Sequence, residues 1–213
     1  MPGTSTRAAF RSRLLARSST TPKERGRMSD LKPEGALDGR TLKESGIQVT
    51  AGPRTPRFNV RGQSTAVSAV LEPLLGVVAP TTPNTVHRGE KGRVDWLGPD
   101  EWLVAPAPDS GPSADALHAA AGAQGIALVE VSDGLVTIHL SGPRAPELLR
   151  AGMPYDLRAL VEGTCAQTRL AQASVIIARE ADARWQLMVR RSMADYVWRW
   201  LDAALLRLTP NPV

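Results

Sequence analysis

One pattern of strands and helices occurs twice along this chain of 213 residues, and the repeat limits the possible folds more than any other feature. In the first copy, apolar residues at helical spacing cover 64–75, and a second helical pattern covers 113–124. Strand-like runs surround these two helices, at 47–49, 58–60, 85–87, 94–97, 101–104 and 126–131. The order is that of the ferredoxin-like β-α-β-β-α-β unit.

The second copy begins at residue 135 and keeps the same marker residues. Its predicted elements are a strand, a short helix, two strands and a long helix, at 135–140, 143–149, 168–178, 184–189 and from Ser192 onward. Gly62 and Gly142 close the first strand of each copy, and Trp102 and Trp185 lie in the returning strands. We therefore predict an α+β protein of two tandem ferredoxin-like βαββα(β) half-units, at 47–133 and 134–209, which share one hydrophobic core.

The positive charge of the chain lies outside this repeat. Residues 1–27 carry a net charge of +6 and the whole chain +5, so the remaining residues sum to −1. A nucleic-acid-binding face needs Lys and Arg clustered on the folded part, so we predict no nucleic-acid partner. No stretch approaches the roughly 20 apolar residues of a membrane-spanning helix, so we predict no membrane association. We expect residues 1–46 to be a disordered basic extension and linker, with Met28 as the natural start.

The residue types that carry chemistry do not form a recognisable pattern. There is no Gly-rich phosphate loop, and the histidines His87, His118 and His139 are too far apart to form a short-spaced metal-ligand pair. The carboxylates without an identifiable acid–base partner are Asp95, Asp100, Glu101, Glu130 and Asp133. We therefore predict no catalytic, cofactor-binding or metal-binding residue in this chain.

Two further features have both a functional and a structural interpretation. Cys165, the single cysteine, has no base in its sequence context, so an inert thiol is favoured, and one cysteine without a disulfide partner fits the cytoplasm. The corner at 141–143 could hold an anion on free backbone amides, but any turn from a strand into a helix uses the same residue types.

The last helix carries more aromatic residues than one buried face requires. Its apolar stripe runs from Met193 to Leu208 and includes Trp200, whereas Trp198 falls off the stripe and Tyr196 flanks it. Aromatic residues are enriched at the buried centres of protein interfaces, so we predict that Tyr196 and Trp198 contact another subunit. The alternative is that the body of the protein wraps this helix more fully.

Six short motifs, taken in order, carry a resemblance to a known family. They are WLGPDEWL at 96–103, VSD at 131–133, LSGP at 140–143, PYDL at 154–157, CAQTRL at 165–170 and RSMADYVW at 191–198. Together they resemble the gamma subunit of heterotetrameric sarcosine oxidase over about residues 55–205. That subunit in turn resembles part of the aminomethyltransferase fold of the glycine cleavage system.

The resemblance implies a subunit of a four-chain enzyme that oxidatively demethylates sarcosine. The products would be glycine, hydrogen peroxide and a one-carbon unit, released as formaldehyde or taken up by tetrahydrofolate. In that family the alpha and beta subunits mainly hold FAD, FMN, NAD and tetrahydrofolate, and the delta subunit holds zinc. This chain would be a non-catalytic subunit without cofactors of its own, in a complex with alpha, beta and delta and in direct contact with alpha.

Two other functions remain open. A stand-alone folate-binding protein of the same fold is one of them, but residues 163–167 lack the Lys, the Tyr and the spacing of the Lys-Gly-Cys-Tyr-x-Gly-Gln signature of iron–sulfur maintenance relatives. An independent catalyst in one chain is the other, and the absence of a nucleophile–base or metal pattern opposes it.

The N-terminal extension provides the first test. A variant that starts at Met28 should unfold at the same temperature as the full chain and assemble equally well with partner subunits, because the removed charge lies outside the repeat. Thermal unfolding and co-purification measure this, and a loss of solubility or assembly would show that the extension belongs to the folded protein.

Overall fold

The computed structural model of the protein describes residues 35–44 and 46–208, which lie within one compact unit, Glu34–Val213. Most of the predicted basic extension therefore lies outside the described residues. The expectation of a disordered linker up to residue 46 is wrong for its last part, because Thr41–Glu44 forms strand β1. Its four residues pair with those of β2 (Ile47–Ala51) in antiparallel register, which satisfies the backbone groups that face β2.

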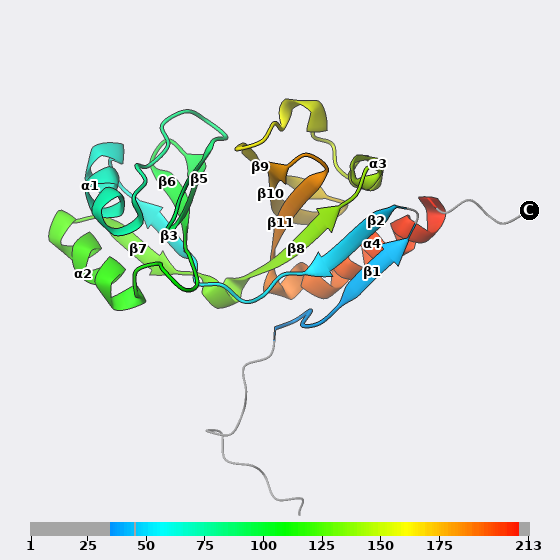
Figure 1. The fold of residues 1–213 in the computed structure, drawn as a ribbon, viewed down its shortest axis with the longest axis horizontal. Coiled ribbons are helices and arrows are strands. Elements are labelled where there is room, and N and C mark those ends of the chain that lie inside the picture. Colours follow the sequence, from blue (N-terminus) through cyan, green and yellow to red (C-terminus); the bar gives the residue numbers. More distant parts are fainter. Residues whose placement is uncertain (1–34, 45, 209–213) are drawn as a thin grey trace, which may run out of the picture. The chain divides into compact units, whose positions relative to one another are not determined.

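The first repeat forms a five-stranded antiparallel sheet in the order β4-β5-β6-β3-β7, called sheet B here. Strand β3 lies between β6 and β7, as the first strand of a ferredoxin-like unit does. Figure 1 shows its two helices, α1 and α2, on one side of the sheet. The elements are β3 (Phe58–Arg61), α1 (Ser64–Leu75), β4 (Val86–Gly89), β5 (Gly92–Gly98), β6 (Glu101–Pro106), α2 (Ala114–Gln124) and β7 (Ala127–Glu130).

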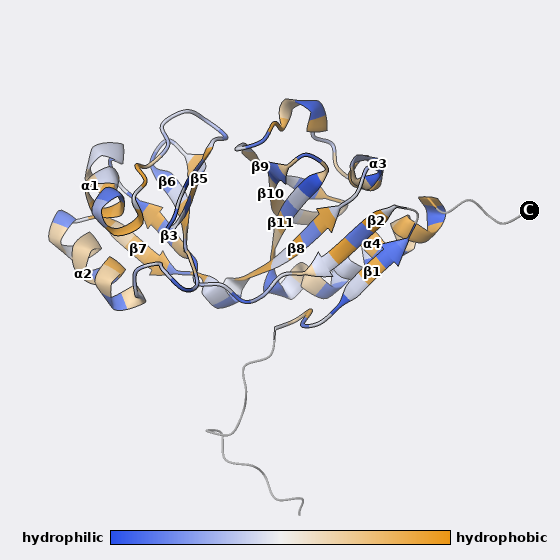
Figure 2. Ribbon diagram, viewed as in Figure 1, coloured by the Kyte–Doolittle hydropathy of each residue, from blue (hydrophilic) through white to orange (hydrophobic). Residues whose placement is uncertain are grey.

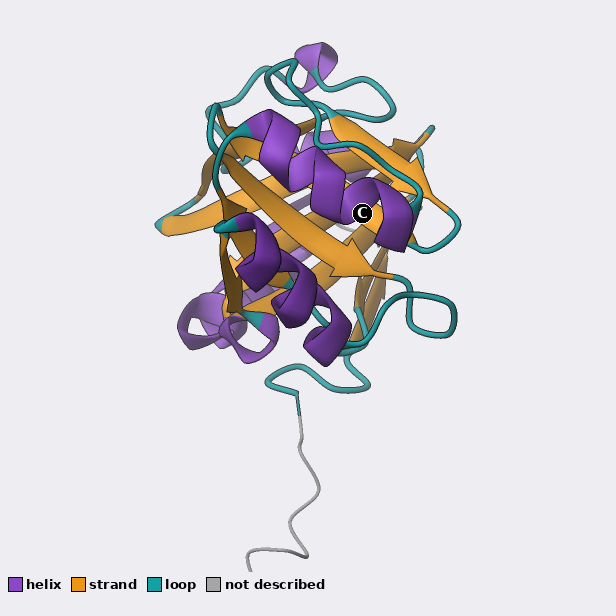
Figure 3. Ribbon diagram, turned by 90° about the vertical axis from the view of Figure 1, so that its left-hand side faces the viewer, coloured by secondary structure: helices purple, strands orange, loops and turns teal. Residues whose placement is uncertain are grey.

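The second repeat forms a six-stranded antiparallel sheet in the order β1-β2-β8-β11-β10-β9, called sheet A here. Helices α3 and α4 contribute to the core of this sheet. Figure 3 views the molecule from the side of sheet B, with the helices of sheet B in front of its strands. The elements are β8 (Leu135–Ser141), α3 (Ala145–Arg150), β9 (Cys165–Leu170), β10 (Ala173–Ala181), β11 (Arg184–Arg190) and α4 (Ala194–Leu208). Short 3₁₀ turns lie at Ser132–Gly134, Leu157–Ala159 and Arg191–Met193.

Strand β2 belongs to a different half of the molecule from the one that the sequence indicated. The sequence places residues 47–49 in the first half-unit, whereas the structure pairs β2 with β8, with Gln48 opposite Ser141 and Thr50 opposite His139. Within the described residues, the second repeat ends in helix α4 and has no strand after it to pair with β8, as β7 pairs with β3 in the first repeat. Strand β2 fills that position beside β8 and so covers an edge that would otherwise expose unpaired backbone groups.

The two sheets have separate hydrophobic cores, so the expectation of one shared core is wrong. One cluster contains Phe58, Leu71 and Trp102 from sheet B and its helices, and the other contains Ile138 and Leu187 from sheet A. Figure 2 shows hydrophobic and hydrophilic residues alternating along the strands. Because alternate side chains point to opposite faces, each sheet buries one face under its own helices and leaves a more polar face.

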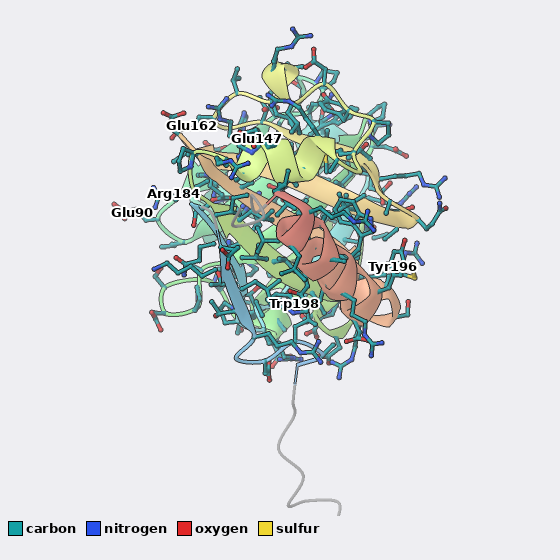
Figure 4. All side chains as sticks on the ribbon, turned by 90° about the vertical axis from the view of Figure 1, so that its right-hand side faces the viewer. Glu90, Glu147, Glu162, Arg184, Tyr196 and Trp198 are labelled. Atoms are coloured by element: carbon teal, nitrogen blue, oxygen red, sulfur yellow. The ribbon has the colours of Figure 1, made fainter. Side chains whose placement is uncertain are left out.

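Helix α4 packs its aromatic residues differently from the predicted stripe. Trp198 is only 6% exposed and belongs to the core of sheet A, because α4 contacts both β11 and the added strand β1. Trp200 is half-buried and lies over Gly152, where a Cβ atom would come within 2.3 Å of the indole. Tyr196 is 38% exposed, and its hydroxyl accepts a hydrogen bond from the backbone N–H of Gln172. Figure 4 labels Tyr196 and Trp198.

Trp198→Ala should therefore lower the free energy of unfolding by about 3–5 kcal/mol, because it removes a buried indole from the core. Leu206→Ala is the matched control on the same helix, since Leu206 is 66% exposed, and it should change stability by less than about 0.5 kcal/mol. Urea unfolding curves measure both values. Equal midpoints for the two variants would contradict the burial of Trp198.

Candidate functional site: the polar layer between the sheets

Charged side chains from both sheets meet between the two cores. Arg93 on β5 donates from Nη1 to Glu180 Oε1 on β10 at 2.7 Å and to Gln186 Oε1 on β11 at 2.8 Å. Its Nε donates to Asp95 Oδ1 at 2.9 Å. Arg88 on β4 also pairs with Glu180, at 2.9 Å. One arginine thus joins two carboxylates and links three strands across the sheets.

The alternation of side chains along β5 explains this arrangement. Val94 belongs to the core of sheet B, so its neighbours Arg93 and Asp95 point to the opposite face. The same alternation in sheet A places Glu180 and Gln186 opposite the side that α4 covers. The sequence analysis named Asp95 but gave no signal for Arg93 or for the partners of Arg93 in sheet A, which lie about 90 residues later.

Burial and charge act in opposite directions on this network. Burial disfavours the charge of Arg93, but the attraction of Asp95 and Glu180 outweighs it, so the pKa of Arg93 is raised. Burial likewise disfavours the charge of Glu180, and Arg93 and Arg88 outweigh it, so the pKa of Glu180 is lowered. Both groups are therefore charged at neutral pH and held in an ion pair, which is unsuitable for a proton shuttle.

Arg57 lies in the same layer and is held by backbone and hydroxyl groups. Its Nη2 donates to Thr137 Oγ1, its backbone N–H donates to Ser132 Oγ at 3.0 Å, and its carbonyl accepts from Val131 N–H at 2.8 Å. Its side chain is buried, with a residue exposure of 3%. Burial, together with the nearby positive charge of Arg93, lowers the pKa of Arg57 to about 10.

The histidines and the cysteine that the sequence analysis considered do not come together. His87 Nδ1 lies 2.9 Å from the carbonyl oxygen of Val78, and His118 packs edge-on against Phe58. His139 is half-buried on β8, and burial lowers its pKa, which favours the neutral ring. Cys165 is 1% exposed, and burial, with a contribution from Asp95, raises the pKa of its thiol to about 12.

The carboxylates have separate partners, and the corner at 141–143 is filled by backbone. Glu101 pairs with Arg61, Asp133 pairs with Arg54, and Glu130 accepts a hydrogen bond from Ser132. At the corner, Gly142 has φ +113°, and a Cβ there would lie 2.0 Å from the carbonyl oxygen of Gly46. In the described part of the chain, no three His, Cys, Asp or Glu residues are placed to hold a metal ion.

A cavity of about 800 Å³ opens where the two polar faces diverge. Leu103 and Met188, each 2% exposed, contribute from the two sheets, and Gln167 Nε2 donates across them to the carbonyl oxygen of Leu97 at 2.8 Å. Its described lining holds serine, threonine, asparagine, glutamine and arginine side chains, but no histidine, cysteine, lysine or carboxylate that could act as a general base.

Comparison with known proteins identifies the family. A model of the sarcosine oxidase gamma subunit family matches residues 61–206. The sarcosine oxidase subunit gamma of Corynebacterium sp. (strain P-1) is 34% identical over 150 residues, which cover 70% of each chain. That of an Arthrobacter species is 33% identical over 140 residues, 64% of this chain and 68% of the relative. The chain belongs to the sarcosine oxidase gamma subunit family.

Solved structures agree with the fold. A chain of the heterotetrameric sarcosine oxidase from Corynebacterium sp. U-96, in complex with pyrrole 2-carboxylate, matches with a TM-score of 0.69 at 24% identity, over 81% of this chain and 90% of that one. Aminomethyltransferase T of the glycine cleavage system from Bartonella henselae matches with a TM-score of 0.59 at 14% identity, over 76% of this chain and 47% of that one. The family and the aminomethyltransferase-like fold inferred from the six motifs are thus confirmed.

The ion-pair network can be tested through stability. Arg93→Met should lower the free energy of unfolding by about 3–5 kcal/mol, because it leaves two carboxylates without their shared partner. Arg88→Met is the matched control: its side chain is 40% exposed, and an exposed ion pair contributes about 0–1 kcal/mol. Denaturant unfolding of both variants measures the difference, and equal losses would mean that Arg93 does not hold the sheets together.

Proposed function

We propose that this chain is the gamma subunit of a heterotetrameric sarcosine oxidase. The complex would convert sarcosine oxidatively to glycine, with hydrogen peroxide and a one-carbon unit that leaves as formaldehyde or as methylenetetrahydrofolate. The observation that carries the proposal is the family match over residues 61–206. It is supported by a relative named as a gamma subunit, about 70% of whose length aligns with this chain.

The proposed role of the chain within the complex is structural. Between the sheets, Arg93, Asp95 and Glu180 are engaged in ion pairs, His139 favours its neutral form, and the Cys165 thiol is buried with a raised pKa. These features support a subunit that contributes no acid, base or nucleophile to the reaction. FAD, FMN, NAD, tetrahydrofolate and zinc would then be held by the other subunits.

The proposed partners are the alpha, beta and delta subunits, with direct contact to alpha. Of the two aromatic residues predicted for an interface, Tyr196 is exposed and can touch a partner, whereas Trp198 supports the helix from within. Among the described helices, each is too short or too polar to cross a membrane. A cytoplasmic location is part of the proposal, because a chain with one cysteine forms no internal disulfide and suits a reducing compartment.

Reconstitution with the alpha, beta and delta subunits tests this role. His87→Ala, His139→Ala and Cys165→Ala should each leave turnover of the assembled complex within about threefold of the native value, because losing a true catalytic acid or base costs about 10²–10⁴-fold. Tyr196→Ala should weaken assembly by about 1 kcal/mol or more, with Leu206→Ala as the control on the same helix.

The contrary outcomes are distinct. Sarcosine turnover by the isolated chain, or a hundredfold loss of rate from one of the three substitutions in an intact complex, would contradict the structural role. Tight binding of tetrahydrofolate by the isolated chain, without assembly, would favour the alternative of a stand-alone folate-binding protein, for which the shared aminomethyltransferase fold is the supporting observation.

A further inference from the structure

Arg57 is a buried cation whose side chain donates a hydrogen bond to a hydroxyl group. Its guanidinium donates to Thr137, and none of the ion pairs within the described residues includes it. The backbone N–H of Arg57 donates to Ser132, and its carbonyl oxygen accepts from Val131. These two hydrogen bonds fix the position from which the side chain extends. A buried charge without a counter-charge is costly, because the desolvation of the ion is not offset by an attraction of similar size.

A cavity of about 300 Å³ lies against this arginine. Its ionisable lining consists of three arginines, Arg57, Arg88 and Arg93, and one carboxylate, Asp95. The rest of the lining includes Thr55 and Gln186, with apolar walls from strand and loop residues at 105–108. One liquid water takes about 30 Å³, so this cavity has room for a small molecule.

The carboxylates near the cavity are already engaged. Asp95 accepts from Arg93 at 2.9 Å, and Glu180 accepts from Arg93 at 2.7 Å and pairs with Arg88 at 2.9 Å. The positive charge of Arg57 is therefore the one that the layer does not balance at ion-pair distance. A planar guanidinium matches the two oxygens of an oxyanion in a bidentate pair, and such charge-assisted hydrogen bonds are the strong ones.

We propose that this cavity binds a small oxyanion, such as a carboxylate, against Arg57. The anion supplies a counter-charge at ion-pair distance, which no described side chain provides, and Arg88 and Arg93 add to the positive potential around it. The cavity is too small for a large cofactor and has apolar walls, which suits a short organic acid. The site does not depend on the proposed role in sarcosine oxidation, because it rests on the charge balance of this chain alone.

Thermal unfolding of the full chain tests the proposal, with sodium acetate or sodium phosphate replacing sodium chloride at constant ionic strength. An oxyanion that binds only the folded protein raises the unfolding temperature along a saturable curve. Arg57→Met should raise the apparent Kd at least about tenfold, since hydrogen bonds to charged groups contribute about 1.5–3 kcal/mol. Arg61→Met is the matched control: Arg61 ends strand β3, which begins directly after Arg57, its side chain is 55% exposed, and the variant should keep the native response.

A second variant and a second sample keep the test decisive. Arg57→Lys retains the positive charge but loses the planar guanidinium that can donate two parallel hydrogen bonds. Calorimetry should therefore give it an affinity for the oxyanion between those of the native chain and Arg57→Met, and it can be measured even if Arg57→Met fails to fold. The saturable response should also persist in the assembled complex. Comparing the apparent Kd for acetate with that for phosphate shows whether the site prefers a carboxylate or an inorganic oxyanion.

Three results would overturn the proposal. A linear rise in unfolding temperature that is equal in native and Arg57→Met chains is a general salt effect. The absence of any saturable response in the native chain means that the cavity holds only water. A response in the free chain that disappears on assembly assigns Arg57 to a contact with another subunit.

Discussion

The hydrogen bonds of Arg93 to Glu180 and Gln186 join the two sheets of this protein, and Asp95, on the same strand as Arg93, adds a second negative charge beside it. Each sheet has its own hydrophobic core under its own helices, so apolar burial stabilises each half separately. Between the halves, a buried ion-pair network lies beside a small apolar cluster of Val86, Cys165 and Ala178. Removing one partner of such a buried ion pair is costly, because it leaves an uncompensated charge. Backbone contacts assist at one edge, where Val86 N–H donates to Gly163 and Cys165 N–H donates to Asn84.

Local patterns in the sequence were sufficient for much of the fold. The apolar spacing of α1 and α4 and the matching residues Trp102 and Trp185 predicted two ferredoxin-like units, which the sheet orders confirm. The partner of β2 could not be predicted, because an alternating strand has the same pattern in either sheet. The burial of Trp198 follows from that pairing, since β1 and β2 widen the sheet beneath α4, and helical periodicity alone does not contain this information.

For the candidate site too, the sequence indicated features that depend on neighbouring residues but not those that depend on contacts between distant segments. The sequence supplied the chemical types, and the structure shows that the hydrogen-bond partners of His87 and Cys165 are backbone carbonyl oxygens, of Val78 for His87 and of Thr85 and Trp96 for Cys165. The sequence did not indicate Arg57, Arg93 or Glu180, since their meeting depends on contacts between residues about 80–90 positions apart. From the sequence alone, a single charged residue in or beside a strand is predicted to be solvent-exposed, because the sheet that packs against it is not known.

The position of β2 in sheet A has a consequence for synthesis and for dissection of the chain. Residues 58–130 are contiguous and can complete sheet B as soon as they leave the ribosome, whereas β2 must wait for β8, which is made about 90 residues later. Pairings between distant segments form slowly, because the loop between them must close first. A cut near residues 131–134 would therefore not yield two independent domains: the N-terminal fragment would carry β1 and β2 without the rest of their sheet, and the C-terminal fragment would lack these two strands.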